Sequence, residues 1–277
     1  MPSKDYLKLM RPLNCVMSAV AVLIAMMIVL PNIQTIGFLR AGLAMAAAFV
    51  ICGAGMAVND YYDIEIDKVN KPNRPLSSGR IMKKSAMAFA IVLFVIGIAL
   101  AFFVNKYAFY LAIINSVVEF VYAWKLKKVL LVGHILVSYL VASLFIFGAA
   151  VMFDIVGLSK LIPIIILSAL AFFSNMGREI YKSAADVLGD KQVGVSSFAT
   201  KFKIPTAKKI ASVFLIISIL LSPLPFLIGI FGIYYLSIVA IADAVFVAAM
   251  LSKVSSAEKY CKAAMIIALV AFILGTI

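Results

Sequence analysis

Two short stretches of the sequence hold most of the carboxylates in a chain that is otherwise poor in them. Seven of the 12 Asp and Glu residues lie in NDYYDIEIDK, which begins at Asn59, and in REIYKSAADVLGD, which ends at Asp190. If the first stretch is helical, Asn59, Asp63 and Asp67 are four residues apart and place three oxygen donors on one face. Asp186 and Asp190 repeat this spacing. Because like charges one turn apart repel, each stretch is unfavourable unless a cation neutralises it.

The donor types indicate which cation this is. Both stretches offer only oxygen ligands, with no His or Cys beside them, and this favours Mg²⁺ or Ca²⁺ over zinc. The D-x-D-x-D-G spacing of an EF-hand is absent. Mg²⁺ usually takes one or two carboxylates and completes its shell with water and phosphate oxygens. Two acidic stretches therefore predict Mg²⁺ shared with a diphosphate substrate.

Basic side chains that could hold such a diphosphate lie beside the acidic stretches. Lys and Arg side chains form strong charge-assisted hydrogen bonds with phosphate oxygens. The candidates come from KPNRPLSSGR, YAWKLKK and REIYK and are Lys71, Arg74, Arg80, Lys125, Lys127, Arg178 and Lys182.

The elements that position these residues are predicted to be membrane-spanning helices. Hydrophobic residues make up 65% of the 277 residues and charged residues only 13%, about half the share found in soluble domains. A spanning helix needs about 20 mostly apolar residues. Nine such stretches fit the sequence, at about 13–30, 38–58, 85–104, 107–123, 129–152, 160–178, 207–226, 230–251 and 260–277. We therefore expect an all-α, polytopic membrane protein with a single domain over residues 1–277.

The distribution of positive charge predicts the orientation in the membrane. The net charge of +13 could suggest nucleic acid, but all of the 25 Lys and Arg residues except Arg40, Lys106 and Lys160 fall on one side of the predicted spans. The positive-inside rule assigns that side, with the N-terminus and both acidic stretches, to the cytoplasm of a multi-pass cell-membrane protein. An odd number of spans then leaves Ile277 outside. Most of these cations are expected to meet anionic membrane lipids rather than nucleic acid.

The two acidic stretches also resemble a known family. NDYYDIEIDKVNKPNRPLSSGR is similar to the first aspartate-rich motif of the UbiA superfamily of intramembrane prenyltransferases, N-D-x-x-D-x-x-x-D followed by K/R-P-x-R-P-L-x-x-G. DVLGDKQVGVSSFATKF resembles the second motif, D-x-x-G-D followed by a Ser/Thr-rich turn. CDP-alcohol phosphotransferases, which also carry a D-x-x-x-D element, would have D-G-x-x-A-R upstream, and it is missing here.

The resemblance implies nine helices around a central cavity and roles for individual residues. The implied Mg²⁺ ligands are Asn59, Asp63, Asp67, Asp186 and Asp190, with Asp60 as a further ligand or a brace. The four aspartates at 63, 67, 186 and 190 are the catalytic candidates, because metal on the departing diphosphate assists ionisation of an allylic C–O bond. The candidate substrate-binding residues are Lys71, Arg74, Lys125, Lys127, Arg178 and Lys182, with Tyr122, Tyr139 and Asn14.

Within the superfamily, KVNKPNRPLSSG and REIYK are most similar to the archaeal ether-lipid branch. This likeness implies transfer of a geranylgeranyl group from geranylgeranyl diphosphate to the glycerol hydroxyl of geranylgeranylglyceryl phosphate. The partners would be an isoprenyl diphosphate and a lipid-like phosphate acceptor, whose phosphate is expected to meet the lysines near 125–128 and 201–209.

Two alternatives stay open at this stage. An aromatic acceptor from a quinone or chlorophyll-type pathway would keep the fold and change the acceptor. A cation channel or transporter would use the acids as an ion site. Transporters often have inverted repeats with helices broken at the midplane, whereas these acids lie at one membrane face beside basic loops. Glu119 and Asp243, isolated within predicted spans, are more typical of structural groups than of a proton relay. The sequence leaves the oligomeric state open.

Overall fold

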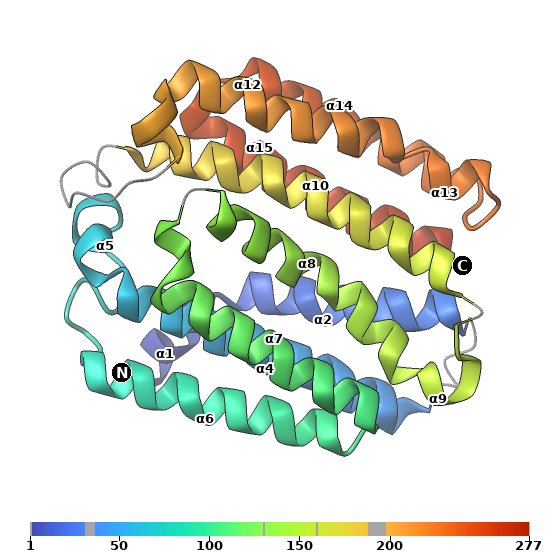
Figure 1. Ribbon diagram of the computed structural model, residues 1–277, viewed down its shortest axis with the longest axis horizontal. Coiled ribbons are helices and arrows are strands. Elements are labelled where there is room, and N and C mark those ends of the chain that lie inside the picture. Colours follow the sequence, from blue (N-terminus) through green and yellow to red (C-terminus); the bar gives the residue numbers. More distant parts are fainter. Residues whose placement is uncertain (1, 31–36, 130, 159, 188–197, 277) are drawn as a thin grey trace.

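The structure is a computed structural model that describes residues 2–30, 37–129, 131–158, 160–187 and 198–276. Within these residues, nine long helices form the body of the molecule: α2 (Pro12–Val29), α4 (Phe38–Tyr62), α6 (Lys83–Phe102), α7 (Lys106–Trp124), α8 (Val132–Val151), α10 (Leu161–Ala185), α12 (Phe198–Leu221), α14 (Ile233–Leu251) and α15 (Val254–Gly275). The short helices are α1 (Pro2–Met10), α5 (Ile64–Asn70), η1 (Leu126–Lys128), α9 (Phe153–Val156) and α13 (Leu224–Leu227). Figure 1 shows the long helices side by side, with α5 at one end and α9 and α13 at the other.

The predicted all-α membrane bundle is confirmed. Among the described residues, eight helices are long and apolar enough to cross a membrane. The ninth, α15, has 22 residues and carries three charged side chains in its first half, Glu258, Lys259 and Lys262. It packs along α14 and α10 like the others, so the nine predicted stretches correspond to nine long helices.

Some helix ends differ from the predicted ends. The predicted span 160–178 continues as α10 to Ala185, and the predicted span 260–277 begins as α15 at Val254. Hydropathy marks only the part of a helix that is apolar, whereas the backbone hydrogen bonds continue into the charged turns. The added turns carry Glu179 and Lys182 of α10, which line the interior cavity described below, and Glu258 and Lys259 of α15.

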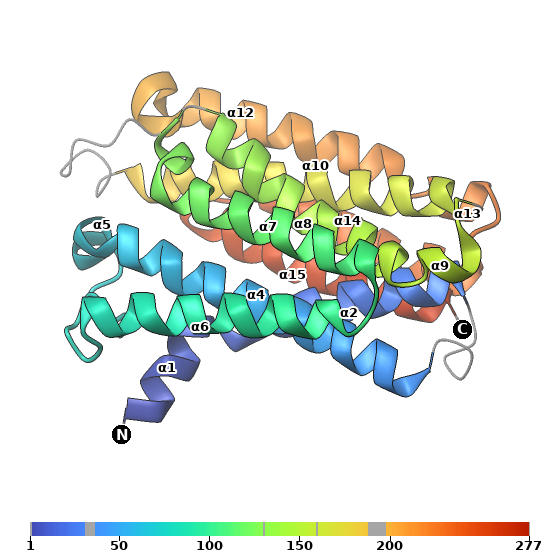
Figure 2. The ribbon, with the colours of Figure 1, turned by 60° about the horizontal axis from the view of Figure 1, so that its bottom comes forward.

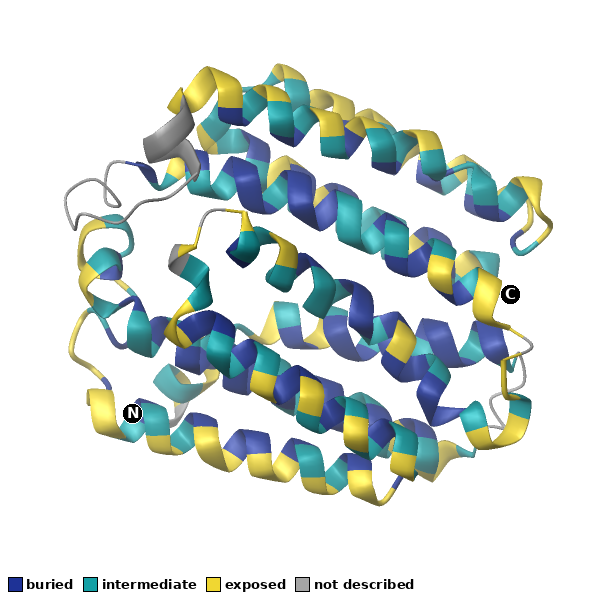
Figure 3. Cartoon of the chain, viewed as in Figure 1, coloured by how far each residue is buried: buried dark blue, intermediate teal, exposed yellow. Residues whose placement is uncertain are grey.

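The outer faces of the bundle are apolar. On α6, Ile91, Val92 and Val95 are 50%, 53% and 62% exposed, and Figure 3 shows such exposed positions along the outer sides of the helices. A contiguous apolar surface of this kind is unfavourable in water and suits contact with lipid tails.

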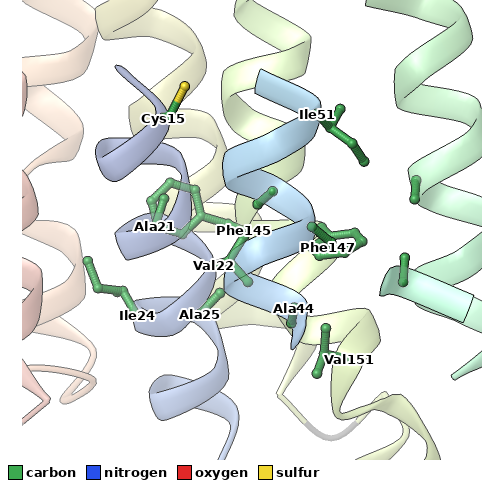
Figure 4. Packing of buried hydrophobic residues seen from close by; sticks show 14 of the residues in the cluster. Cys15, Ala21, Val22, Ile24, Ala25, Ala44, Ile51, Phe145, Phe147 and Val151 are labelled. Carbon is green, nitrogen blue, oxygen red and sulfur yellow. The ribbon is translucent and has the colours of Figure 1, made fainter. Parts of the chain in front are cut away.

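The interior is packed through small residues. Figure 4 shows Ala21, Val22 and Ala25 of α2 beside residues of α4 and α8. Close approach of helix backbones through small residues is typical of membrane bundles, where dispersion contacts rather than the hydrophobic effect hold helices together. α15 also contacts α2, so the last long helix packs against the first. Figure 2 shows α1 at the same end of the bundle as α5.

Candidate active site

A cavity of about 370 Å³ lies among α2, α4, α7, α8, α10, α14 and α15. Its wall is charged at the end nearest α5. Towards the far ends of the same helices the wall is mostly apolar, although Ser222 and Asp243 also line it and are hydrogen-bonded to each other. The apolar lining residues there include Leu144, Phe145, Phe147, Leu170, Leu269 and Phe272. The cavity therefore offers a polar head site and an apolar channel in one space.

The first acidic motif forms part of the charged wall. Asn59, Asp63 and Asp67 all line the cavity. α4 ends at Tyr62 and α5 begins at Ile64, so Asp63 stands at the junction of two helices. The hydrogen-bond ladder nevertheless continues, because the Asp63 N–H donates to the Asn59 carbonyl at 2.9 Å and the Asp67 N–H donates to the Asp63 carbonyl at 2.8 Å. The predicted spacing thus places the three donors on one wall, although the helix is interrupted at Asp63.

Each carboxylate of this motif has a basic partner. Lys127, from the connection after α7, donates to Asp63, and Arg74 donates to Asp67. The Asn59 side-chain oxygen, in contrast, is buried and accepts no hydrogen bond from the described residues. A buried acceptor of this kind is costly unless a cation or donor satisfies it.

Asp60 does not line the cavity. It is 2% exposed and lies behind the wall. There it accepts hydrogen bonds from Arg11 and, at 3.0 Å, from Arg74. Asp60 was predicted to ligate Mg²⁺ or to brace the site, and its place behind the wall, with two guanidinium groups on Oδ1, is the geometry of a brace.

The second acidic motif approaches the first through Asp186. This residue follows the end of α10, and its carboxylate lies 3.0 Å from Lys71 Nζ. Its backbone carbonyl accepts a hydrogen bond from the Asn70 amide at 3.2 Å. The structure thus brings Asp186 to the segment that follows Asp67. Asp190 lies outside the described residues.

A second group of charges lines the cavity from α10. Glu179 accepts hydrogen bonds from Arg178 at 2.7 Å and from Lys182 at 3.0 Å, and Arg178 also donates to Glu258 of α15 at 2.9 Å. Arg178 and Lys182 were predicted from the sequence as substrate-binding residues, and both reach the cavity wall.

The structure separates three further candidates from this wall. Lys125 is exposed and does not line the cavity, because η1 turns Lys127 rather than Lys125 inward. Tyr139 also lies off the wall and donates to Asn115, which does line it, at 3.3 Å. Arg80 pairs with Asp5 at 3.0 Å. Tyr122 and Asn14 do line the cavity, as predicted.

Sequence reasoning missed two cations at the wall. Arg11 and Lys262 line the cavity, but in the sequence they were only part of the topological charge signal. Neither lies in an acidic motif. The one sequence signal that could have identified Arg11 as a cavity residue was its position, because it directly precedes Pro12 and the first span.

Electrostatics keep Asp63 and Lys127 ionised. Burial of Asp63 favours the neutral acid, but the nearby Lys127 charge outweighs it, and the pKa of Asp63 lies below its ordinary value. Burial likewise lowers the pKa of Lys127, and the Asp63 carboxylate reverses this, so the pKa of Lys127 is raised. For Asp67 burial prevails over the charge of Arg74, and its pKa is raised. A cation at the wall would favour the ionised form of Asp67.

The donor set fits a Mg²⁺ ion that shares a diphosphate. Within the described ranges, no three His, Cys, Asp or Glu side chains converge as a ligand cage. Mg²⁺ does not require such a cage, because water and phosphate oxygens supply most of its ligands. The unpartnered Asn59 oxygen, together with the Asp63 and Asp67 carboxylates on the same wall, provides hard oxygen donors of the type this ion prefers. The surrounding cations suit phosphate oxygens.

Comparison with known proteins agrees with this arrangement. A model described as the UbiA prenyltransferase family matches residues 18–274. Digeranylgeranylglyceryl phosphate synthase of Methanococcoides burtonii is 41% identical over 283 residues, covering 98% of this chain and 99% of the relative. The enzyme of the same name from Methanopyrus kandleri is 38% identical over 276 residues, covering 98% of each chain.

Solved structures share the fold. A structure described as digeranylgeranylglyceryl phosphate synthase aligns with a TM-score of 0.74 and 35% identity, over 99% of this chain and 98% of that chain. A UbiA homologue from Aeropyrum pernix K1 aligns with a TM-score of 0.83 at 20% identity, over 96% and 99% of the two chains. A UbiA homologue from Archaeoglobus fulgidus, solved with GPP and Mg²⁺, aligns with a TM-score of 0.72 at 19% identity, over 98% of each chain.

The family match spans nearly the whole chain, and the cavity carries the family's first aspartate-rich motif on its wall. The chain therefore belongs to the UbiA prenyltransferase family and is a multi-pass membrane enzyme that transfers a prenyl group with release of diphosphate.

Proposed function

We propose that this enzyme transfers a geranylgeranyl group from geranylgeranyl diphosphate to the glycerol hydroxyl of geranylgeranylglyceryl phosphate, with Mg²⁺ as cofactor. The observation that carries the proposal is the single cavity in which a charged head site continues into an apolar channel. The names of the relatives that are 38% and 41% identical over nearly the full chain support this choice of substrates. The product would be the second ether bond of an archaeal-type membrane lipid.

The donor's diphosphate would bind at the charged end. Mg²⁺ held by Asn59, Asp63 and Asp67, with Asp186 and Asp190 from the second motif, would neutralise the charge that grows on the leaving diphosphate. Lys71, Arg74, Lys127 and Lys182 reach the same wall and would bind the phosphate oxygens. Each of these cations forms an ion pair with a carboxylate, which fixes its position on the wall.

The prenyl tail would occupy the apolar channel. Ionisation of the C–O bond leaves an allylic cation that water would capture, and the apolar wall excludes water from it. Tyr122, buried on the wall near the charged end, can place its ring beside that cation. The glycerol hydroxyl then attacks the cation and loses its proton as the ether forms.

The charged end of the cavity is proposed to face the cytoplasm of the cell membrane. Among the described residues, the basic side chains gather at the end of the bundle that carries α5, and Arg40, Lys106 and Lys160 are the basic residues at the other end. In this orientation the N-terminus is cytoplasmic and the C-terminus lies outside. Both water-soluble head groups would then enter from the cytoplasm.

An acceptor panel tests the proposal. Purified enzyme in detergent would be supplied with labelled geranylgeranyl diphosphate, Mg²⁺ and one acceptor at a time, and products would be identified by mass spectrometry. We expect ether formation with geranylgeranylglyceryl phosphate and none with hydroxybenzoate or a quinone precursor. Prenylation of an aromatic acceptor alone would replace this proposal with the aromatic alternative.

A further inference from the structure

Lys262 of α15 forms no salt bridge with any carboxylate of the described residues, although Glu258 lies one turn away on the same helix. The other Lys and Arg side chains that line the cavity within the described ranges each form an ion pair: Arg11, Lys71, Arg74, Lys127, Arg178 and Lys182. Lys262 instead donates a hydrogen bond to the Asn14 side-chain oxygen of α2 at 2.7 Å. An ammonium group on the wall of an intramembrane cavity is costly unless an anion compensates it. The position therefore suits an anionic ligand.

Two further donors beside Lys262 lack a strong acceptor. Arg11 Nη1 lies 3.3 Å and Asn14 Nδ2 lies 3.7 Å from the sulfur of Met56, which is on α4. A thioether sulfur is a weak hydrogen-bond acceptor. All four side chains line the cavity. Arg11 and Asn14 thus both direct a donor nitrogen at the Met56 sulfur, and the Lys262 ammonium lies beside them on the Asn14 side-chain oxygen.

We propose that Lys262, Asn14 and Arg11 form an anion subsite that binds the phosphate of the lipid acceptor. This inference rests on the function proposed above, because it assigns the phosphate of geranylgeranylglyceryl phosphate to these residues. Three donors from three side chains match the several acceptor oxygens of a phosphate monoester. Lys262 supplies a positive charge that no salt bridge within the described residues neutralises. The second terminal nitrogen of Arg11 donates to Asp60, which fixes the orientation of the guanidinium group.

The location of the subsite fits the chemistry of the acceptor. Met56 precedes Asn59 by three residues in α4, which is about one turn, or about 5 Å along the helix. In the acceptor, the free hydroxyl and the phosphate ester belong to the same glycerol unit. A phosphate bound beside Met56, one helical turn from Asn59 along α4, would therefore keep the free glycerol hydroxyl of the acceptor close to the prenyl carbon that loses diphosphate.

The subsite differs from the lysines near 125–128 and 201–209 that the sequence suggested for this phosphate. Lys127 lines the cavity but pairs with Asp63, Lys125 is exposed and off the wall, and Lys208 donates to the Ser252 carbonyl at 2.8 Å. Lys262 lies far from these lysines in the sequence, and it reaches Asn14 only because α15 packs against α2.

Steady-state kinetics of Lys262→Met test the subsite. The substitution keeps the side-chain length and removes the charge. We expect the KM for geranylgeranylglyceryl phosphate to rise roughly 10- to 100-fold, the range for losing a charged hydrogen-bond partner, while the KM for geranylgeranyl diphosphate stays within about twofold. Lys259→Met is the matched control, because Lys259 lies on the same helix, is exposed and does not line the cavity. It should behave as the unsubstituted enzyme.

A phosphate-free acceptor separates a phosphate contact from a general effect on the site. The unsubstituted enzyme should strongly prefer geranylgeranylglyceryl phosphate over geranylgeranylglycerol in kcat/KM, and Lys262→Met should reduce that preference by the same 10- to 100-fold factor. Unchanged preference would overturn the subsite. An equal rise in the KM for the prenyl diphosphate would also overturn it, because Lys262 would then belong to the donor site.

Further variants keep the test decisive. Size-exclusion chromatography in detergent shows whether Lys262→Met folds. If it does not, Asn14→Leu takes its place and should show the same selective loss of acceptor affinity. An unchanged acceptor affinity in Asn14→Leu would reject the subsite. Lys262→Arg retains the charge and should keep most of the preference for the phosphorylated acceptor. If the unsubstituted enzyme transfers to no glyceryl phosphate, the proposed function itself fails, which is a different result from a selective defect in a variant.

Discussion

At the scale of single residues, carboxylates and cations at the charged end of the cavity form specific ion pairs. Asp63 pairs with Lys127, Asp67 with Arg74, and Asp186 with Lys71. The spacing of Asn59, Asp63 and Asp67 was enough to predict their common wall. It could not predict which cation each acid meets, because Lys127 is 64 positions from Asp63 in the chain and only the packing of helices brings the two together.

The role of Asp63 leads to a first prediction. Asp63→Asn removes one charged oxygen donor while keeping the size of the side chain, so we expect prenyl transfer to fall at least about 100-fold, as is usual when electrostatic stabilisation of a leaving group is lost. Activity with saturating substrates and Mg²⁺ measures the effect. Glu65→Gln is the control, because Glu65 is exposed on α5 and pairs only with Lys68. An active Asp63→Asn enzyme would show that this wall does not hold the metal.

Asp60 should respond differently from Asp63. It braces Arg11 and Arg74 from behind the wall. Loss of one partner from a buried ion pair costs about 3 to 5 kcal/mol, and we expect the lower end because both arginines are partly exposed. We therefore expect Asp60→Asn to lower the thermal unfolding temperature and to raise the KM for the prenyl diphosphate. The Mg²⁺ concentration that gives half-maximal activity should stay unchanged. A large increase in that concentration would instead make Asp60 a metal ligand.

At the scale of elements, the break between α4 and α5 is the feature that positions the first motif. A continuous helix would carry Asp67 two turns beyond Asn59 along one axis. The structure instead ends α4 at Tyr62 and starts α5 at Ile64, with Asp63 at φ −92° and ψ 4°. Propensity does not predict this break, since no Pro or Gly lies in DYYDIEIDK. At this break, Asp63 and Asp67 form ion pairs with Lys127 and Arg74, which lie outside both helices.

The contact between α2 and α8 gives a prediction for helix packing. A Cβ atom on Gly148 of α8 would lie 2.5 Å from the Val22 carbonyl oxygen and 2.6 Å from the Ala25 methyl group. Gly148→Val should therefore separate α8 from α2 and destabilise the protein by about 2 kcal/mol, the usual cost of overpacking. Thermal unfolding in detergent measures this. Gly42→Ala is the control, because no atom lies within 4 Å of its added Cβ, and equal melting temperatures for the two variants would contradict the packing.

At the scale of the whole molecule, hydropathy predicted the number and the order of the long helices. It could do so because every helix that crosses a bilayer must be long and apolar, whichever helices it packs against. It could not predict that Lys262 and Asn14, which are 248 positions apart, would share a hydrogen bond. Contacts of this kind depend on the ring of helices closing between α15 and α2, and a single sequence carries no local signal for them.

The proposed orientation makes a prediction for the assembled membrane. In a variant whose three cysteines are replaced, Lys68→Cys at the α5 end should react with a membrane-impermeant maleimide in inverted vesicles and not in right-side-out vesicles. Leu158→Cys, which is exposed at the opposite end, should show the reverse. Labelling of Lys68→Cys from outside intact cells would contradict a cytoplasmic active site.

We propose that the enzyme transfers a geranylgeranyl group to a glyceryl phosphate with the help of Mg²⁺ bound at the wall formed by Asn59, Asp63 and Asp67. The most direct test measures ether product by mass spectrometry after chelation of the purified enzyme and stepwise return of Mg²⁺. We predict that chelation abolishes product formation, that Mg²⁺ restores it in the unsubstituted enzyme, and that Mg²⁺ does not restore it in Asp63→Asn. Ether formation that persists after complete chelation would contradict the account.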